Sequence, residues 1–247
     1  MQLKVLTYNI HRAIGVDRRF RPGRIVDILA HHNADIALLQ EVDEGVPRSR
    51  ELDLARELGR ESGYPHMVAG YNVSLKAGRY GNAVLSRWPF RIHRNIDLTV
   101  DDRKRRGCLH TRMTIEKGGK AHELDVFNLH LGLSARERTR QIGMLVRSAE
   151  FIAIPKESPC LVVGDFNDWR SLLLPVFVEI LGFKSATRHR FGRQAAIRTY
   201  PSFSPTGALD KIYFRGPLRL LGARSCRLRV SRVASDHLPI VAEFELG

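Results

Sequence analysis

Side chains that can bind metal or move protons follow an apolar run in the second half of the chain. The run 161–163 ends at Gly164, and Asp165, Asn167 and Asp168 follow shortly after. A short run of Leu and Val that stops at a glycine predicts a buried strand. Polar groups at the end of such a strand either close a turn or lie where sheet proteins keep their chemistry. This segment alone does not distinguish these two interpretations.

The same layout recurs along the chain, so the turn interpretation would have to hold several times over. Polar side chains stand beside or within other strand-like segments, and they are Asn9, His11, Glu41, His130, Asp210, Asp236 and His237. Each alone could be a turn residue, a solvated acid, a hydrogen-bonded core histidine or a paired carboxylate. Collected at one rim, they would supply the hard oxygen ligands that suit Mg²⁺ or Mn²⁺, and imidazoles that move protons near neutral pH.

These side chains need a framework, and hydrophobic patterning predicts strands in larger number than helices. The strands are expected at 3–8, 35–39, 65–70, 82–86, 108–115, 122–128, 160–163, 209–214 and 239–245. The helices are expected at 23–32, 49–62, 134–153 and 170–181. Ile25, Ile28 and Leu29 recur at helical spacing, and Ser134 with Glu137 forms a capping box. This mixture favours a layered α/β or α+β sandwich over a strictly alternating wound sheet.

The composition indicates one folded domain with an electropositive surface. The chain has 247 residues, of which 43% are hydrophobic, and no linker-like or low-complexity tract divides it. We therefore expect a single domain over residues 1–247. The net charge of +14 favours anionic partners such as nucleic acid, phospholipid headgroups or soluble phosphates, without choosing among them.

Cysteine usage and the N-terminal sequence favour a cytoplasmic protein. Cys108, Cys160 and Cys226 lack the spacing of a disulfide framework or a zinc site. The N-terminus has no signal-peptide profile, and no apolar stretch approaches membrane-spanning length. We expect a monomer with at most peripheral membrane contact.

Seven short blocks, taken in order, resemble the endonuclease/exonuclease/phosphatase superfamily. They are Thr-Tyr-Asn-Ile-His at 7–11, Leu-Gln-Glu-Val at 39–42, the segment 81–89, Asn-Leu-His-Leu-Gly at 128–132, Gly-Asp-Phe-Asn at 164–167, Leu-Asp-Lys-Ile at 209–212 and Ser-Asp-His-Leu-Pro at 235–239. The resemblance spans nearly the whole chain. It implies a four-layer α-β-β-α sandwich, with two packed mixed β-sheets flanked by helices. It also implies cleavage of a phosphate ester that depends on Mg²⁺ or Mn²⁺.

The resemblance assigns metal-binding, water-activating and phosphate-binding roles to five residues. Glu41 resembles the family's principal metal-binding carboxylate, with Asn9 beside it and Asp236 available to the same or a second metal position. Asp165 resembles the residue that orients or deprotonates the attacking water. Asn167 resembles its partner on the phosphate.

Histidines complete the catalytic set that the resemblance implies. Asp210 and His237 resemble the family's carboxylate–imidazole pair, in which the acid holds the ring tautomer. His130 matches a histidine of deoxyribonuclease-like and sphingomyelinase-like members, whereas abasic-site endonucleases carry tyrosine there. Which histidine acts as the general acid stays open at this point.

Substrate contacts are expected from His11, Asn82 and Arg106. Asn82 resembles a polar residue that lines the family cleft, and Arg106 ends the basic run 103–106. Such a run is either a solvated face or a phosphate-binding border. The stretch 187–208 is expected to be a variable loop, whose aromatic residues Phe191, Tyr200 and Phe203 could stack on bases or insert among lipid tails.

These observations predict a divalent-metal-dependent phosphodiesterase acting on nucleic acid or a phospholipid-like diester. In-line attack by an activated water would break the phosphorus–oxygen bond. One alternative is a phosphomonoesterase acting on an inositol-phosphate or similar headgroup. A binding module built on an inactive version of the fold is a remote alternative, because every expected catalytic position is filled.

Overall fold

A computed structural model describes residues 1–117, 119–188 and 196–247, and within these ranges the strands form two sheets of six. The first sheet has the order β11-β12-β1-β2-β4-β3, and the second has the order β5-β6-β7-β8-β10-β9. The first comprises β1 (Gln2–Asn9), β2 (Ile36–Glu44), β3 (His66–Ser74), β4 (Arg79–Ser86), β11 (Leu218–Ser225) and β12 (Ile240–Leu246). The second comprises β5 (Phe90–Asp97), β6 (Gly107–Lys117), β7 (Lys120–His130), β8 (Cys160–Asp165), β9 (Lys184–Ser185) and β10 (Asp210–Arg215).

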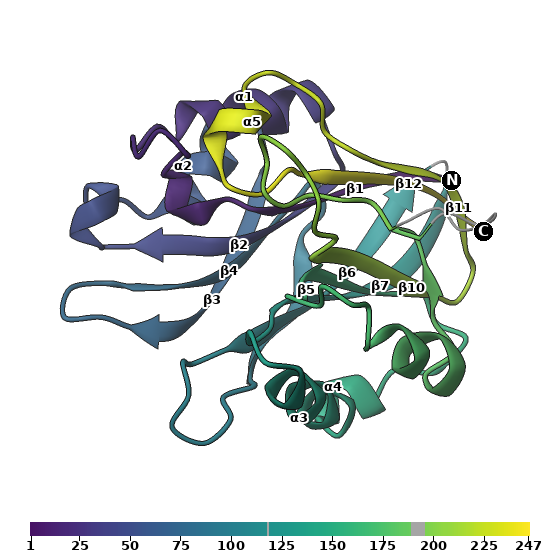
Figure 1. Cartoon of the computed structure of the whole chain (residues 1–247). Coiled ribbons are helices and arrows are strands. Elements are labelled where there is room, and N and C mark those ends of the chain that lie inside the picture. Colours follow the sequence, from purple (N-terminus) through teal and green to yellow (C-terminus); the bar gives the residue numbers. More distant parts are fainter. Residues whose placement is uncertain (118, 189–195) are drawn as a thin grey trace.

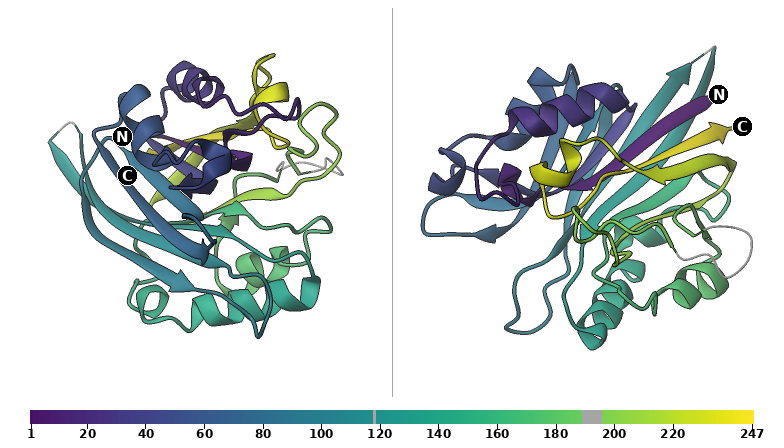
Figure 2. Two further views of the ribbon diagram at one scale, coloured as in Figure 1. Left: turned by 90° about the vertical axis from the view of Figure 1, so that its left-hand side faces the viewer. Right: turned by 45° about the horizontal axis from the view of Figure 1, so that its top comes forward.

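Helices cover the outer face of each sheet (Figure 1). Over the first sheet lie α1 (Gly23–His32), α2 (Leu54–Glu61) and α5 (Ser231–Ala234), and over the second lie α3 (Ala135–Val146), α4 (Ala149–Ile152) and a π-helical turn, η3 (Val176–Ile180). Two short 3-10 turns, η1 (His11–Ala13) and η2 (Pro47–Ser49), follow β1 and β2. Figure 2 shows the sheets stacked between these helices.

Three apolar clusters hold the layers together. One joins the facing surfaces of the two sheets, with Val5 of β1 and Val163 of β8 among its members. A second packs Ile25 and Ile28 of α1 on the first sheet, and a third packs Ile142 of α3 on the second. The four-layer sandwich of two mixed sheets flanked by helices is thereby confirmed.

Each sheet contains one central parallel pair, and these pairs place the polar strand ends. β1 pairs in parallel with β2, and β7 pairs in parallel with β8, whereas the other pairings are antiparallel. Because parallel strands end at the same edge of a sheet, Asn9 comes near Gln40 and Glu41, and His130 comes beside Asp165. The two sheet edges then face one another across the site.

The helix expected at 23–32 is confirmed as α1, but the other helices are shorter than expected. The span 134–153 is divided into α3 and α4, because the Ser148 hydroxyl accepts a hydrogen bond from the Phe151 backbone and starts a new helix. The span 170–181 forms turns followed by η3, and in the span 49–62 only α2 is α-helical.

Strands β5, β9 and β11 were not expected. β5 and β11 are edge strands with mostly exposed or half-exposed side chains, so they lack a clear apolar pattern. β9 has two residues. Among the described residues, no helix combines the length and the apolar character needed to cross a membrane.

Candidate active site

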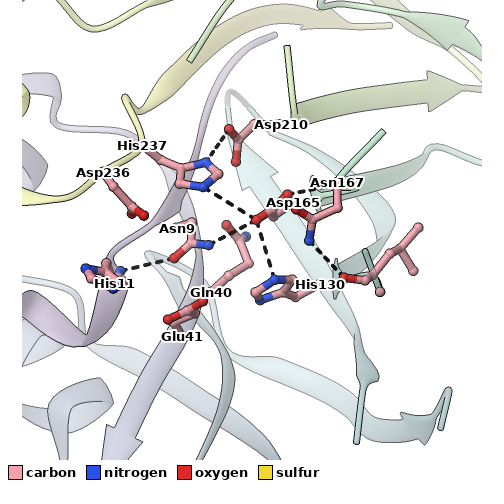
Figure 3. Close-up of polar contacts among 12 residues, drawn as sticks. Asn9, His11, Gln40, Glu41, His130, Asp165, Asn167, Asp210, Asp236 and His237 are labelled. Atoms are coloured by element: carbon pink, nitrogen blue, oxygen red, sulfur yellow. Dashed lines mark hydrogen bonds and ion pairs between the residues drawn. The ribbon is translucent and has the colours of Figure 1, made fainter. Parts of the chain in front are cut away.

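Asp165, at the end of β8, is the centre of a buried polar cluster (Figure 3). Its side chain accepts hydrogen bonds from Asn9 Nδ2 at 3.0 Å and from the Asn167 backbone N–H at 2.9 Å. His130 Nε2 lies 3.5 Å and His237 Nε2 lies 3.7 Å from Asp165 Oδ2. Asp165 is only 1% exposed. The structure therefore brings together, around one carboxylate, residues from four separate segments of the chain.

The backbone of β8 explains this position. In the sheet register, Asp165 stands opposite His130 of β7 on one side and Asp210 of β10 on the other. Gly164 has φ +139°, and a Cβ there would come within 1.9 Å of the Leu129 carbonyl oxygen. Only glycine allows this close approach between β7 and β8. Asn167 then turns the chain with φ 51°, a left-handed conformation that asparagine tolerates.

Asp210 and His237 form a direct carboxylate–imidazole pair. His237 Nδ1 lies 2.8 Å from Asp210 Oδ2, and the Thr199 hydroxyl donates to the same oxygen. The Tyr200 ring packs beside the imidazole, with ring centroids 5.1 Å apart. With Nδ1–H donated to Asp210, the ring turns Nε2 toward Asp165.

The buried setting gives the three titratable groups different charge states. Burial, opposed by the charge of His237, raises the pKa of Asp165 to about 6. Burial alone would lower the pKa of His237, but the carboxylates of Asp210 and Asp165 outweigh it and raise that pKa to about 10. Burial and the nearby charge of Arg106 hold the pKa of His130 well below its ordinary value. At neutral pH, His237 is therefore a cation and His130 a neutral imidazole.

Glu41 and Asp236 lie beside this cluster without joining its hydrogen bonds. Glu41 has φ 57° at an irregularity in β2, and its Oε2 lies 3.3 Å from Arg12 Nε. Asp236 Oδ1 accepts a hydrogen bond from the Ser235 hydroxyl at 3.3 Å. In the view of Figure 3 the two carboxylates flank Asn9, whose Oδ1 accepts from the His11 backbone N–H. Two carboxylates and an amide oxygen are donors that fit Mg²⁺ or Mn²⁺.

A second set of donors fits a metal less well. Among the described residues, Asp165, Asp210 and His237 hold possible ligand atoms within 4.8 Å of one another. In this set His237 Nδ1 lies 2.8 Å from Asp210 Oδ2, so the imidazole and one of the two carboxylates are already engaged with each other. The positive charge of His237 balances part of the negative charge of the Asp165 and Asp210 carboxylates.

Arg106 stands next to the cluster as a buried cation. It lines a small cavity with Glu41, Asn82, Arg105 and His130, and it is 7% exposed. Within the part of the chain that the structure describes, its guanidinium has neither a hydrogen-bond nor an ion-pair partner, and its Nε is fully enclosed. A buried, unpaired guanidinium is costly unless an anion pairs with it.

The other two residues expected to bind substrate are engaged with the backbone. The Asn82 amide donates to the carbonyl oxygens of Gly107 and Asn128, at 3.1 and 3.2 Å. His11 Nδ1 lies 2.9 Å from the Ile14 carbonyl oxygen, within the turn that follows β1. Asn82 therefore holds the cavity wall, and His11 has one ring nitrogen left for another partner.

Sequence reasoning missed the polar pair that ties the two sheets together beneath the site. Gln40 Nε2 donates to Asn128 Oδ1 at 2.7 Å, and Asn128 Nδ2 donates to the carbonyl oxygens of Leu39 and Ala83, both at 2.9 Å. Both side chains are fully buried. Because both residues stand within otherwise apolar strands, the sequence could have indicated that they are buried and hydrogen-bonded. Thr199 gave no such signal, because its contact with Asp210 depends on the folded loop.

The basic segments have mixed placements. Arg103 forms an ion pair with Glu137 at 3.5 Å, and Lys104 lies over the Tyr80 ring, whereas Arg105 and Arg106 line the cavity. Of the stretch 187–208, Tyr200 and Phe203 are described. Residues 189–195, including Phe191, lie outside the described residues.

Comparisons with known proteins identify the family and the fold of the chain. A family model described as the endonuclease/exonuclease/phosphatase family matches residues 6–237. The uncharacterized protein YbhP of Escherichia coli (strain K12) is 34% identical over 252 residues, covering 98% of this chain and 96% of YbhP. Among solved structures, the mannosyl-6-phosphatase Bt3783 of Bacteroides thetaiotaomicron has a TM-score of 0.76 at 18% identity, covering 98% of this chain and 99% of its own. ANGEL2, a 2′,3′-cyclic phosphatase, has a TM-score of 0.74 at 17% identity, with coverages of 100% and 96%.

Proposed function

This chain belongs to the endonuclease/exonuclease/phosphatase family, and from that membership we propose that it hydrolyses a phosphate diester with the aid of bound Mg²⁺ or Mn²⁺. Members of the family act as nucleases, phosphodiesterases or phosphatases. The substrate would be nucleic acid or a phospholipid-like diester. The observation that carries the proposal is the buried carboxylate of Asp165, whose Oδ2 lies 3.5 Å from His130 Nε2 and 3.7 Å from His237 Nε2.

Asp165 is the proposed base for the attacking water. Asn9 and the Asn167 backbone N–H hold its carboxylate in place, so its orientation is settled before substrate arrives. A carboxylate whose pKa is about 6 is a better proton acceptor near neutral pH than one with an ordinary pKa. The water oxygen bonds to phosphorus while its proton passes to Asp165.

Three other side chains would act on the phosphate itself. Asn167 Nδ2 donates to the Leu131 carbonyl oxygen at 2.9 Å, which leaves its second amide proton for a phosphate oxygen. The His237 cation, oriented by Asp210, would stabilise the charge that develops as the phosphorus–oxygen bond breaks and would donate its proton to the departing oxygen. The unpaired guanidinium of Arg106 would bind an equatorial phosphate oxygen.

Glu41, Asn9 and Asp236 are the proposed metal ligands. Arg12 partly neutralises Glu41, because Arg12 Nε lies 3.3 Å from Glu41 Oε2. A bound divalent ion would supply further positive charge next to the phosphate.

One observation favours a phosphomonoesterase as the second candidate. The cavity beside His130 holds Arg105 and the unpaired Arg106, and this positive charge suits the additional negative charge of a monoester. We rank it second because only two arginines line this small cavity.

A substrate panel with and without chelator tests the proposal. The purified protein is incubated with Mg²⁺ against a soluble aryl phosphodiester, an aryl phosphomonoester, plasmid DNA, RNA, phospholipid vesicles and inositol phosphates. We expect diester hydrolysis that stops with chelator and returns with added Mg²⁺. Turnover of the monoesters alone would establish the second candidate instead. Hydrolysis that persists after exhaustive chelation would contradict the metal requirement.

A further inference from the structure

Four large apolar side chains stand exposed on the loops that follow β7 and β8 and on the loop that precedes β10. Leu133 is 75% exposed, Phe203 is 65% exposed, and Trp169 and Leu172 are each 54% exposed. We call these four residues the apolar rim. Leu133 follows His130 by three positions, and Trp169 follows Asn167 by two. Large apolar side chains exposed together beside a functional site often mark a contact surface.

A buried ion pair holds two of the rim loops together. Arg138 Nη1 donates to the Leu133 carbonyl oxygen at 2.7 Å, and Arg138 Nη2 lies 3.5 Å from Asp168 Oδ1. The same Asp168 oxygen accepts from the Leu172 backbone N–H at 3.0 Å. Leu133 and Leu172 are therefore presented by loops that are tied to one another.

Aromatic packing links the rest of the rim to the catalytic cluster. The Trp169 and Tyr200 rings lie edge to face with centroids 5.6 Å apart, and Tyr200 in turn packs beside His237. Tyr200 bridges to Gly207 and closes the turn that carries Phe203. A Cβ at Gly207 would come within 2.7 Å of the Trp169 ring, so glycine allows the indole to rest on this turn. The rim is thus connected to His237 through Tyr200.

Positive charge accompanies the rim. Arg136, three residues beyond Leu133, and Arg170, next to Trp169, are exposed. Neither has an ion-pair partner in residues 1–117, 119–188 or 196–247. Exposed Trp, Phe and Leu flanked by arginine is the combination that enters the headgroup region of an anionic bilayer.

We propose that the apolar rim is a membrane-docking surface that inserts into an anionic phospholipid bilayer. It would present the catalytic cluster to a phosphodiester at the membrane surface. This inference rests on the proposed phosphodiesterase function and names phospholipid as its substrate class. Nucleic acid fits the rim less well, because bases stack on aromatic faces, and Leu133 and Leu172 have none.

Trp169 provides a direct probe of docking. The chain has two tryptophans, and the other, Trp88, packs against the core between the sheets. The purified full chain is titrated with vesicles of phosphatidylcholine alone and with vesicles that also contain phosphatidylglycerol. We expect a blue shift of tryptophan emission and co-sedimentation with the anionic vesicles. The shift should disappear in Trp169→Phe, which reports only Trp88.

A triple variant and a matched control test the role of the rim. Leu133→Ser/Leu172→Ser/Phe203→Ser should bind anionic vesicles roughly a thousandfold more weakly, since burial of each of the three large apolar side chains is worth about a factor of ten. Ile92→Ser/Leu221→Ser removes exposed apolar side chains from the edge strands β5 and β11 and should bind like the original protein. Far-ultraviolet circular dichroism and denaturant unfolding verify that each variant is folded.

The outcomes separate the docking surface from the proposed function. Absence of vesicle binding, or equal binding by the triple variant and the control, would overturn the docking surface. A shift of Trp169 emission by single-stranded DNA and not by vesicles would overturn it in favour of base stacking. If the original protein does not hydrolyse a soluble aryl diester, that result would count against the proposed function, whether or not the protein binds vesicles.

Discussion

The pKa values of Asp165 and His237 both differ from the values that these side chains have in water. Burial disfavours the charged form of both groups, but each lies beside an opposite charge that favours it. For Asp165, burial is the larger effect, so its pKa rises to about 6. For His237, two neighbouring carboxylates are the larger effect. One buried site thus holds a base that is half-protonated at pH 6 and a cation that persists above neutral pH.

The raised pKa of Asp165 makes a prediction about stability without metal. The unfolded carboxyl has a pKa near 3.8 and the folded one a pKa of about 6, so between these values the folded state binds more protons. The free energy of unfolding therefore falls as pH rises through this window. In chelator at pH 8, Asp165→Asn should be more stable than the original protein by about 2 kcal/mol, because a neutral amide replaces a buried charge.

Denaturant unfolding at pH 8 and pH 5 checks this prediction. The advantage of Asp165→Asn should shrink at pH 5, where the carboxyl of the original protein is largely protonated. A variant that is equally destabilised at both pH values would contradict the electrostatic account.

Asp210 and His237 should behave as one unit in catalysis. Asp210→Asn removes the carboxylate that orients and charges the imidazole, and His237→Gln removes the imidazole itself. Each single variant should lose roughly a hundred- to ten-thousandfold in kcat/KM, and the double variant should lose little more. Steady-state kinetics of the three variants on a soluble diester complete a double-mutant cycle. A loss of kcat/KM in the double variant equal to the product of the two single losses would show that the two residues act independently.

At the scale of elements, β8 depends on a glycine that lets it approach β7. Gly164→Ala should lower the free energy of unfolding by about 2 kcal/mol or more, because the added methyl group meets the Leu129 carbonyl oxygen in a strained backbone conformation. Gly222→Ala in the edge strand β11 is the matched control, since a Cβ there meets nothing within 4 Å. Urea unfolding measures the free energy of unfolding of both variants. Equal losses in the two variants would contradict this role of Gly164.

The central strands could be predicted from the sequence because burial imposes a pattern on them. β8 is buried along its whole length and appears as a continuous apolar run. The edge strand β5 is exposed along most of its length, so nothing in its sequence distinguishes it from a loop. The sequence pattern of 134–153 is compatible with one continuous helix, but the Ser148 hydroxyl caps a second helix instead. Which of the two forms depends on tertiary packing, so the sequence did not predict the break.

The placement of the candidate residues at strand ends could be predicted, because polar side chains follow apolar runs there, but their mutual contacts could not. The amide of Asn9 reaches Asp165 across 156 positions of sequence, and this contact depends on how the two sheets stack. The same stacking brings Gln40 to Asn128. Arg106 belonged to a basic run that resembles a solvated face, and only the folded loop shows that it is buried while Arg103 is not.

At the scale of the whole molecule, two stacked sheets create one site from segments spread over the entire chain. The net charge of +14 gives the molecule an attractive field for polyanions. The apparent KM for a polyanionic substrate should therefore rise about tenfold between roughly 50 and 200 mM salt. The KM for a small aryl diester should change by less than about twofold. Equal salt dependence for both substrates would contradict long-range attraction.

The central claim is that the cluster around Asp165 hydrolyses phosphate esters. Its most direct test is kcat/KM for a soluble aryl phosphodiester in Mg²⁺, measured for the original protein and for Asp165→Asn, with folding verified by circular dichroism. The variant keeps the shape of the side chain but loses the proton acceptor, so the account predicts a fall of about a thousandfold. Activity within about tenfold of the original protein would contradict it.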